Sequence, residues 1–391
     1  MELARGSVEL PDNALECRIR VISDIRMLPF VPGGGRSRVQ IAHRNGIVWI
    51  NGGTLGARHE GCANNSSGRV QMKVGVFAVL FRSMEFEKAL DYIASVGCEA
   101  VEIGCGGYVG DAHCKPVELL EDEKARISFK QAVDSRGLEI SALSAHSNPV
   151  HPDPAVGEPH QAAIRDTILL AEKLGVDTVV TFSGCPGGGP EDKHPNWVTC
   201  PWPLDFSATV KWQWEEVLIP YWQDTAAFAK DHGVRIAIEM HPGFCVYSAE
   251  TMLALRQAAG DNVGANFDPS HLFWQGADPV CAIRALGEAI FHFHAKDTKI
   301  DPINTSINGV LDTKSYRDEI NRSWIFRTVG YGNGESVWRD IVSNLRLVGY
   351  DGALSIEHED SLMSGREGFE KAVAFLKDVL IEEQPGTAYW A

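Results

Sequence analysis

The chain has 391 residues and a formal net charge of −16, with 44% hydrophobic and 23% charged residues. This composition excludes a mainly disordered protein, and the lack of an apolar run of about 18 residues excludes a membrane span. The acidic balance also argues against a nucleic-acid-binding protein with a broad basic surface.

Residues 1–70 differ from the rest of the chain in charge. They hold nine Arg, no Lys and six acidic residues, a net of +3, whereas residues 71–391 hold 27 basic and 46 acidic residues, a net of −19. The segment is rich in Gly, Ser and Asn, and its apolar patch Ile47–Ile50 predicts a single strand. We expect residues 1–70 to be a poorly ordered extension or a gene-model artefact that precedes a natural start at Met72. The alternative is a basic arm that docks a partner.

From Met72 onward, short β-branched runs alternate with amphipathic stretches. The runs are apolar on both faces, which is typical of parallel strands covered on both sides. The predicted strands are Lys73–Val79, Ala100–Ile103, Glu139–Ser144, Thr178–Phe182, Arg235–Glu239, Gly264–Phe267, Ile290–His294 and Ala353–Ile356.

Five stretches between these strands place apolar residues at helical spacing and end near a glycine. The predicted helices are Phe86–Val96, Ala162–Leu174, Trp222–Asp231, Ala249–Ala259 and Val337–Val348. Eight strands alternating with helices predict an α/β fold, a (β/α)8 TIM barrel over residues 72–382, with a tail at 383–391. A doubly wound open sheet is the alternative. That fold would place a glycine-rich phosphate loop after the first strand, and residues 79–82 contain no glycine.

The last four predicted strands each end in an acidic residue or a histidine. TIM-barrel enzymes build their sites at these C-terminal strand ends. Three carboxylates and one imidazole would repel one another or remain poorly solvated unless they held a cation, so we predict one divalent metal ion. The donor set favours Mn²⁺, with Mg²⁺, Co²⁺ or Zn²⁺ as alternatives. The predicted metal ligands are Glu239, Asp268, His294 and Glu357.

The seventh strand carries two histidines and is followed by a lysine. His292 and His294 share one face of the strand, so Phe291 and Phe293 are expected to face the helix layer. We expect His292 to be a buried neighbour of the ligands. Lys296 is predicted to stabilise an oxyanion, with an ion pair to Asp297 as the alternative.

Other side chains near the strand ends are candidates for substrate contact. His271, three residues after Asp268, is predicted either to bind the metal or to touch the substrate. His146 and His241 follow the third and fifth strands, and a satisfied structural histidine is the alternative for each. The long loop after the fourth strand carries Trp197 and Trp202, which we predict to stack on a carbohydrate. Packing of these indoles against the barrel or a second subunit is the alternative.

Four strings at the strand ends, EMHP, NFDPSHL, FHFHAKD and SIEHED, resemble the xylose isomerase-like TIM-barrel superfamily of sugar and sugar-phosphate isomerases and epimerases. The resemblance covers residues 72–380. It implies the same four metal ligands and places the superfamily's histidine on His271 and its loop arginine on Arg327. It also implies that Glu239 and Glu357 serve as an acid/base pair. The endonuclease branch is not expected, because the fourth strand end lacks a histidine and no Asp-x-His follows His294.

These observations predict a metal-dependent sugar or sugar-phosphate isomerase or epimerase that works through an enediolate. The alternatives are a keto-sugar or keto-inositol dehydratase or lyase, including cleavage of 3-keto-glycosides, and a non-catalytic carbohydrate-binding barrel. We expect a small carbohydrate as the partner, and we expect binding neither to nucleic acid nor to a membrane. The sequence is compatible with a homo-oligomer. The nine cysteines include no CxxC pair and no secretory leader is recognised, so we expect a cytoplasmic protein.

Overall fold

The computed structural model describes residues 38–43, 46–51, 71–383, 386 and 390. The chain divides into two units, residues 1–67 and 68–391. In the first unit, β1 (Arg38–His43) pairs antiparallel with β2 (Gly46–Asn51). The strand predicted at Ile47–Ile50 is therefore one of a pair rather than single. The rest of the predicted extension lies outside the described residues.

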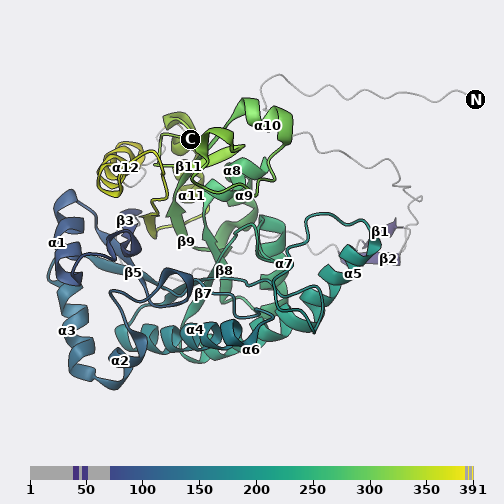
Figure 1. Cartoon of the computed structure of the whole chain (residues 1–391), viewed down its shortest axis with the longest axis horizontal. Coiled ribbons are helices and arrows are strands. Elements are labelled where there is room, and N and C mark those ends of the chain that lie inside the picture. Colours follow the sequence, from purple (N-terminus) through teal and green to yellow (C-terminus); the bar gives the residue numbers. More distant parts are fainter. Residues whose placement is uncertain (1–37, 44–45, 52–70, 384–385, 387–389, 391) are drawn as a thin grey trace, which may run out of the picture. The chain divides into compact units, whose positions relative to one another are not determined.

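The second unit is built on a closed barrel of eight parallel strands (Figure 1), which confirms the predicted (β/α)8 fold. The strands pair in chain order, and the last closes on the first, with Ala353 opposite Lys73. The first strand ends two residues earlier than predicted because Ala78–Phe81 form a 3₁₀ turn. The barrel strands are β3 (Lys73–Phe77), β4 (Ala100–Gly104), β5 (Glu139–Ser144), β6 (Thr178–Phe182), β7 (Arg235–Glu239), β8 (Val263–Phe267), β9 (Ile290–Ala295) and β12 (Ala353–Ile356).

Helices connect the strands, and all of them except α5 and α10 bury side chains in the core. They are α1 (Phe86–Val96), α2 (Pro116–Glu121), α3 (Glu123–Asp134), α4 (Pro154–Leu174), α5 (Leu204–Trp212), α6 (Ile219–Asp231), α7 (Ala249–Ala259), α8 (Pro269–Gln275), α9 (Pro279–Leu286), α10 (Pro302–Asn308), α11 (Glu335–Leu347) and α12 (Gly365–Val379). A π-helical turn, Gln213–Leu218, joins α5 to α6, and short 3₁₀ turns lie at Gly107–Val109, Gly287–Ala289 and Glu319–Asn321.

Local capping chemistry sets the helix ends. Gly97 closes α1 and Gly175 closes α4 in the left-handed conformation, at φ of 96° and 71°, which glycine adopts without steric cost. Helix α4 begins at Pro154, eight residues before the predicted start. The Asp153 side chain accepts a hydrogen bond from the backbone N–H of Ala155, and a proline is well suited to the first turn.

The interior of the barrel is lined by alternate strand residues, which continue upward into the polar site. Three small side chains form an interior cluster: Ala142, Val180 and Ala237. Phe291 packs against this cluster, whereas Phe293 lies in the main core under the helices. The expectation that both rings face the helices is therefore wrong for Phe291. The pairing of β8 with β9 shifts register between Ala265 and Asn266, which interrupts the strict alternation near Phe291.

The segment after β9 has its own structure. β10 (Asp297–Ile300) pairs antiparallel with β11 (Trp324–Arg327), and α10 lies between them in sequence. The Asp297 carboxylate accepts hydrogen bonds from the backbone N–H groups of Gly330, Gly332 and Asn333 and from the indole of Trp338. One buried carboxylate thus anchors the end of this inserted segment to the barrel.

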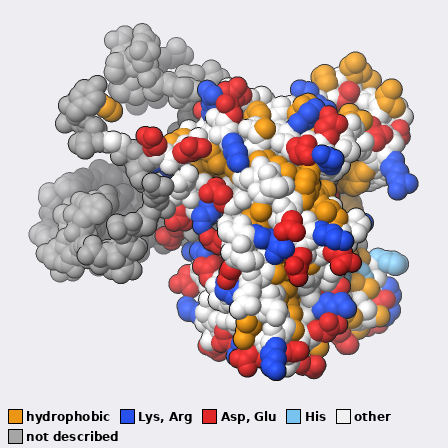
Figure 2. Space-filling view, turned by 90° about the vertical axis from the view of Figure 1, so that its left-hand side faces the viewer, with side chains coloured by type: hydrophobic (Ala, Val, Ile, Leu, Met, Phe, Trp, Pro, Cys, Tyr) orange, Lys and Arg blue, Asp and Glu red, His pale blue; other side chains and the backbone are white. Residues whose placement is uncertain are grey.

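The surface of the described residues agrees with the composition. No described helix is both long and apolar enough to cross a membrane. On the face shown in Figure 2, acidic and basic side chains are interspersed, so this face shows no extended basic area.

Candidate metal centre and active site

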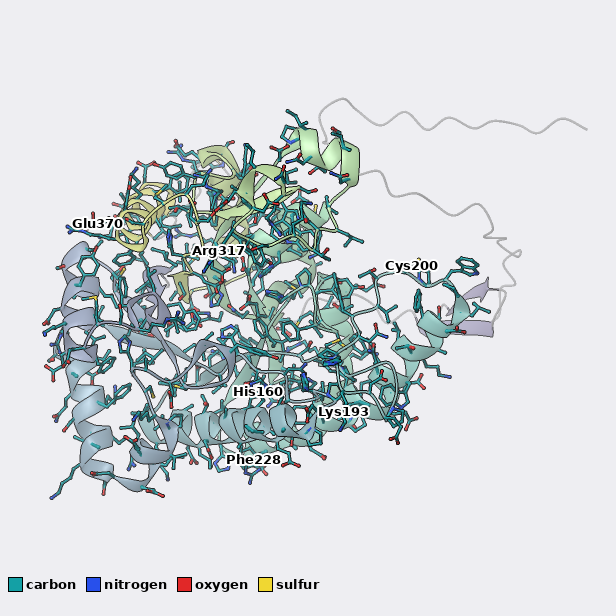
Figure 3. All side chains as sticks on the ribbon, in the orientation of Figure 1. His160, Lys193, Cys200, Phe228, Arg317 and Glu370 are labelled. Carbon is teal, nitrogen blue, oxygen red and sulfur yellow. The ribbon has the colours of Figure 1, made fainter. Side chains whose placement is uncertain are left out.

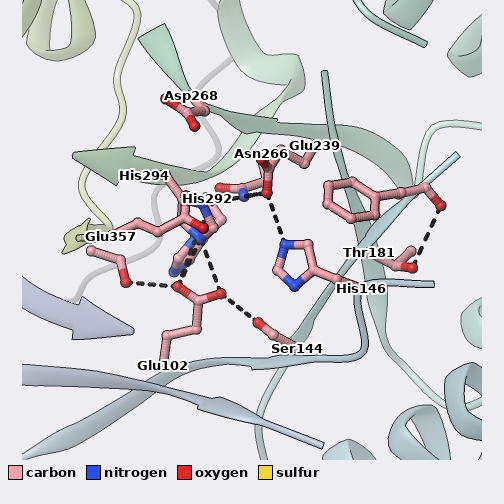
Figure 4. Close-up of polar contacts among 12 residues, drawn as sticks. Glu102, Ser144, His146, Thr181, Glu239, Asn266, Asp268, His292, His294 and Glu357 are labelled. Carbon is pink, nitrogen blue, oxygen red and sulfur yellow. Dashed lines mark hydrogen bonds and ion pairs between the residues drawn. The ribbon is translucent and has the colours of Figure 1, made fainter. Parts of the chain in front are cut away.

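The four predicted metal ligands lie together at the C-terminal end of the barrel (Figure 4). Glu239 ends β7 and His294 lies in β9, while Asp268 and Glu357 directly follow β8 and β12. Each side chain offers one ligand atom, and these atoms lie within 4.8 Å of one another. The Nδ1 atom of His294 is 3.1 Å from Oε2 of Glu357 and 3.4 Å from Oε2 of Glu239. The structure therefore brings all four side chains to one point.

The donor set fits a divalent cation. Asp268 and His294 are fully buried, and Glu239 is 1% exposed. Asp268 Oδ2 and His294 Nδ1 make no hydrogen bond with any described residue, although charged groups lie close to both. Buried polar atoms without such partners are uncommon because they lose their solvation. A cation held by three carboxylates and one imidazole would satisfy both atoms.

Lys296 lies against the carboxylates of this cluster. Its ammonium is 2.7 Å from Glu357, 3.0 Å from Asp268 and 3.1 Å from Glu359. Burial lowers the pKa of Lys296, but the surrounding carboxylates outweigh burial and raise the pKa well above its usual value. The lysine is therefore a buried, charged donor next to the candidate ligands. The alternative partner, Asp297, instead anchors the inserted segment.

Three predicted histidines surround the Glu239 carboxylate. His146 Nε2 lies 2.8 Å from one carboxylate oxygen and His271 Nε2 lies 3.3 Å from the other. His271 is also 3.2 Å from Asp268. The ring of His241 contacts that of His271, at 4.1 Å between centroids. Burial, followed by the charge of His271, lowers the pKa of His241 to about 4, so His241 is neutral at pH 7.

The remaining candidates lie farther from the four ligands. The Arg327 guanidinium donates to Asp360 at 3.0 Å and lies over the ring of Tyr331. Trp197 lines a cavity together with His241 and His271. Trp202 is 73% exposed and does not line that cavity.

The loop that carries both tryptophans joins β6 to α5, and Figure 3 marks it by Lys193 and Cys200. Arg317 in the same figure marks the segment inserted after β9. The structure thus brings Trp197 to the barrel mouth and leaves Trp202 on the surface.

The sequence profile described as xylose isomerase-like TIM barrel matches residues 90–379. The chain belongs to this family. A relative from Bacillus subtilis (strain 168), bearing the name uncharacterized protein YfiH, is 38% identical over 312 residues, which is 79% of this chain and 99% of the relative.

Solved structures of other family-like barrels have the same fold. The probable 3-DHS dehydratase AsbF from Bacillus anthracis aligns at a TM-score of 0.55 and 17% identity, over 78% of this chain and 99% of that one. The D-psicose 3-epimerase from Clostridium cellulolyticum H10, solved with D-tagatose, aligns at 0.52 and 14% identity, over 79% and 98%. This xylose isomerase-like barrel therefore shares its fold with a D-psicose 3-epimerase and a probable 3-DHS dehydratase.

One buried glutamate of this xylose isomerase-like barrel, Glu102, was not predicted from the sequence to belong to the site. The carboxylate of Glu102, in the middle of β4, contacts His294 Nε2 at 2.9 and 3.0 Å and accepts a hydrogen bond from Ser355 at 2.6 Å. Ser144 donates to the same carboxylate. Burial raises the pKa of Glu102, but the charges of His294 and His292 outweigh burial and lower the pKa to about 2. Glu102 is therefore an ionised acceptor that holds the Nε2 side of His294.

A signal for Glu102 was present in the sequence. Val101 and Ile103 are fully buried and pack in the main core, so the glutamate between them faces the barrel interior. A charged residue between two core residues of one strand requires a buried partner. That partner is 192 residues away in the sequence, so no local pattern identifies it.

We expect Glu102→Gln to weaken Mn²⁺ binding by roughly 10–100-fold, the usual cost of losing the hydrogen-bond partner of a metal-binding histidine. With Glu102 ionised, a metal-bound His294 would keep its proton on Nε2 and offer the Nδ1 lone pair to the ion. A neutral amide no longer favours that arrangement. Titration calorimetry measures the affinity, and Glu99→Gln, an exposed change next to β4, is the matched control. Wild-type affinity in Glu102→Gln would contradict this role.

Proposed function

We propose that this protein is a divalent-metal-dependent isomerase or epimerase that acts on a sugar or sugar phosphate. The observation that carries the proposal is the convergence of Glu239 and Glu357 with Asp268 and His294. In strand order the two glutamates lie on either side of the aspartate and the histidine. This arrangement offers a site for a cation with a carboxylate on each side of it.

Glu239, Asp268, His294 and Glu357 would hold the metal ion, for which Mn²⁺ is the first choice. When bound, the ion would attract two neighbouring oxygens of an α-hydroxy ketone or aldehyde and acidify the C–H bond between them. The remaining chemistry belongs to side chains of this chain.

The two glutamates differ in their surroundings, which suits a pair with separate tasks. Glu239 is buried and oriented by His146, Asn266 and His271. The side chain of Glu357 is 18% exposed and has Lys296 beside it. One carboxylate would take the proton from the substrate carbon to give an enediolate, and the other would return a proton. Such acid–base help contributes about 10²–10⁴-fold in rate.

Neighbouring polar groups would orient the substrate and stabilise charge on it. Lys296 is charged and close enough to the ligands to donate to an oxyanion of the substrate. His271 contacts both Glu239 and Asp268, so it holds the acid–base carboxylate and reaches the same space. We assign substrate contact to His146, His241, Arg327 and Trp197. Trp202 would need the loop after β6 to move before it could join them.

A second candidate is elimination of water or an alcohol from a keto sugar or keto inositol. One carboxylate would remove the α-proton, the C–O bond at the β-carbon would break, and the departing oxygen would take a proton from Lys296. The observation in favour is the charged Lys296 ammonium, 2.7 Å from Glu357, which is a proton donor beside the base. The fold shared with a probable dehydratase is consistent with this reaction.

Incubation of the Mn²⁺-loaded protein with a panel of keto sugars in D2O tests both candidates. Isomerisation or epimerisation is expected to place one deuterium on carbon without loss of any other atom. Elimination is expected to give a product that lacks water or the aglycone. Mass spectrometry separates these outcomes. No exchange and no elimination across the panel would count against the proposal.

A further inference from the structure

An aromatic cavity of about 280 Å³ opens beside the candidate metal centre. The loop after β6 contributes Trp197, α8 contributes Trp274, and the segment inserted after β9 contributes Tyr316 and Trp324. Four aromatic rings from three separate parts of the chain therefore meet around one space. The cavity is comparable to the lower end of small-molecule sites, which have volumes of roughly 300–1,000 Å³.

The cavity reaches the candidate metal centre through two histidines. His241 and His271 line it, and His271 directly contacts Glu239 and Asp268. A second cavity of about 330 Å³ shares His241 and Tyr316 with the first. Glu359, which lines this second cavity, is an ion-pair partner of Lys296. The two cavities thus share part of their lining, and each includes a residue that contacts the four ligands or Lys296.

The aromatic wall is the side of the cavity formed by Trp197, Trp274, Tyr316 and Trp324. A buried charge holds part of this wall in place. The Arg322 guanidinium, 1% exposed, lies 4.4 Å from the ring centre of Tyr316 and 4.6 Å from that of Trp324. It donates to the backbone carbonyl of Trp324 at 3.1 Å and to that of Lys314. The ring of Trp324 also stacks on that of Trp274, with 4.6 Å between centroids and 6° between planes. These contacts hold the rings of Tyr316 and Trp324 on Arg322 and the ring of Trp274 on that of Trp324.

The chemistry of the wall indicates the kind of ligand. Indole and phenol faces stack on flat rings and on the apolar faces of sugar rings. The indole N–H groups of Trp197 and Trp274 are buried and have no hydrogen-bond partner among the described residues. Unpaired buried donors are uncommon because each costs roughly 1–3 kcal/mol. A ring that carries oxygen atoms would place an apolar face on these aromatic rings and its oxygen atoms near the polar side chains that also line the cavity, His241, His271 and Thr313.

We propose that this cavity binds a second, oxygen-bearing six-membered ring of the substrate, so that the substrate is a glycoside rather than a free monosaccharide. The reacting ring, which must carry a ketone group, would lie at the four ligands and the second ring among Trp197, Trp274, Tyr316 and Trp324. The second ring is a pyranose or a phenolic aglycone, since both share the required chemistry. This inference rests on the proposed function for the location of the reacting ring.

Binding of three probes to the full-length, Mn²⁺-loaded protein tests the proposal without requiring turnover. The probes are methyl β-D-glucopyranoside, cellobiose and 4-hydroxyphenyl β-D-glucopyranoside. The affinity of each probe is measured by ligand-observed NMR titration. At least one of the two-ring probes is expected to bind at least tenfold tighter than the methyl glucoside. Tighter binding of cellobiose identifies a sugar as the second ring, and tighter binding of the hydroxyphenyl glucoside identifies a phenol.

Variants locate the preference on the cavity wall. Tyr316→Leu is expected to remove most of the two-ring preference and to leave binding of the methyl glucoside unchanged. Trp197→Ala is independently expected to remove most of the two-ring preference. Trp212→Ala, on α5 and outside this cavity, is the matched control and is expected to keep the preference. Equal affinity for all three probes would overturn the proposal, as would a preference that survives both substitutions.

The failure of this inference can be told apart from failure of the proposed function. A two-ring preference without proton exchange in D2O would leave the subsite standing and remove the isomerase or epimerase. Exchange without a two-ring preference would support the enzyme and remove the subsite.

Discussion

Glu239→Gln and Glu357→Gln are each expected to lower exchange of the substrate α-proton by at least about 10²-fold, with little change in the folded state. A glutamine keeps the size of the side chain but neither accepts nor returns a proton at neutral pH, and general acid–base catalysis contributes about 10²–10⁴-fold. The rate of deuterium incorporation in D2O is measured by NMR on the keto sugar of the panel that exchanges fastest with the wild type.

Glu359→Gln is the matched control for this pair. It also removes a carboxylate that contacts Lys296, but Glu359 is 49% exposed and is not one of the four converging ligands. We expect a much smaller loss of exchange than for either of the paired glutamates. Full exchange in a Glu239→Gln, Glu357→Gln double variant would refute the paired-carboxylate mechanism.

His294→Ala and Asp268→Asn are expected to lose bound Mn²⁺, and with it all exchange activity. Each change removes one of four ligand atoms, and Asp268→Asn does so with almost no change in volume. The loss of affinity is expected to exceed the roughly 10–100-fold that follows removal of a histidine's hydrogen-bond partner. Metal content after gel filtration, measured by mass spectrometry, is the readout.

His292→Gln is the control for the histidine. His292 lies on the same strand face as His294 but contacts Asn266 and Ser141, and it is outside the four-ligand group. We expect this variant to retain its metal. If His294→Ala kept a full complement of Mn²⁺ while His292→Gln lost it, the ligand assignment would have to move from one histidine to the other.

The fold and the main cluster were predictable because they follow from short-range patterns. Apolar runs that stop at Glu239, Asp268 and Glu357 mark strand ends, and a parallel barrel brings its C-terminal strand ends together. Closure of the barrel then fixes which side chains meet, without knowledge of any particular contact. His294 followed from the same reasoning and from its face of β9.

Contacts between distant segments were not predictable in this way. Glu102 lies in mid-strand, so a search of strand ends passes over it, and its partner His294 lies on another strand. The positions of the tryptophans in and near the loop after β6 were likewise not predictable from local sequence. Trp222, close to that loop in sequence, is fully buried and donates to the carbonyl of Ser183, whereas Trp202 is exposed. Composition alone indicated aromatic rings but could not say which of them reach the mouth.

No strand or helix was predicted in the segment inserted after β9. It contains β10, α10 and β11, which the buried Asp297 carboxylate ties to the barrel. The strands are only four residues each, and their pairing spans a helix and a loop, so no sustained period reveals them. The aromatic wall of the cavity of about 280 Å³ depends on this segment, which supplies Tyr316 and Trp324, so the cavity could not be predicted from the sequence.

The central claim is that Glu239, Asp268, His294 and Glu357 hold one catalytic divalent cation. The most direct measurement is an anomalous difference map, recorded at the manganese edge, of crystals grown with Mn²⁺. We predict a single strong peak within bonding distance of the three carboxylates and of His294 Nδ1. A map without a peak at this position, or with its peak among Glu102, His292 and His294 instead, would contradict the account.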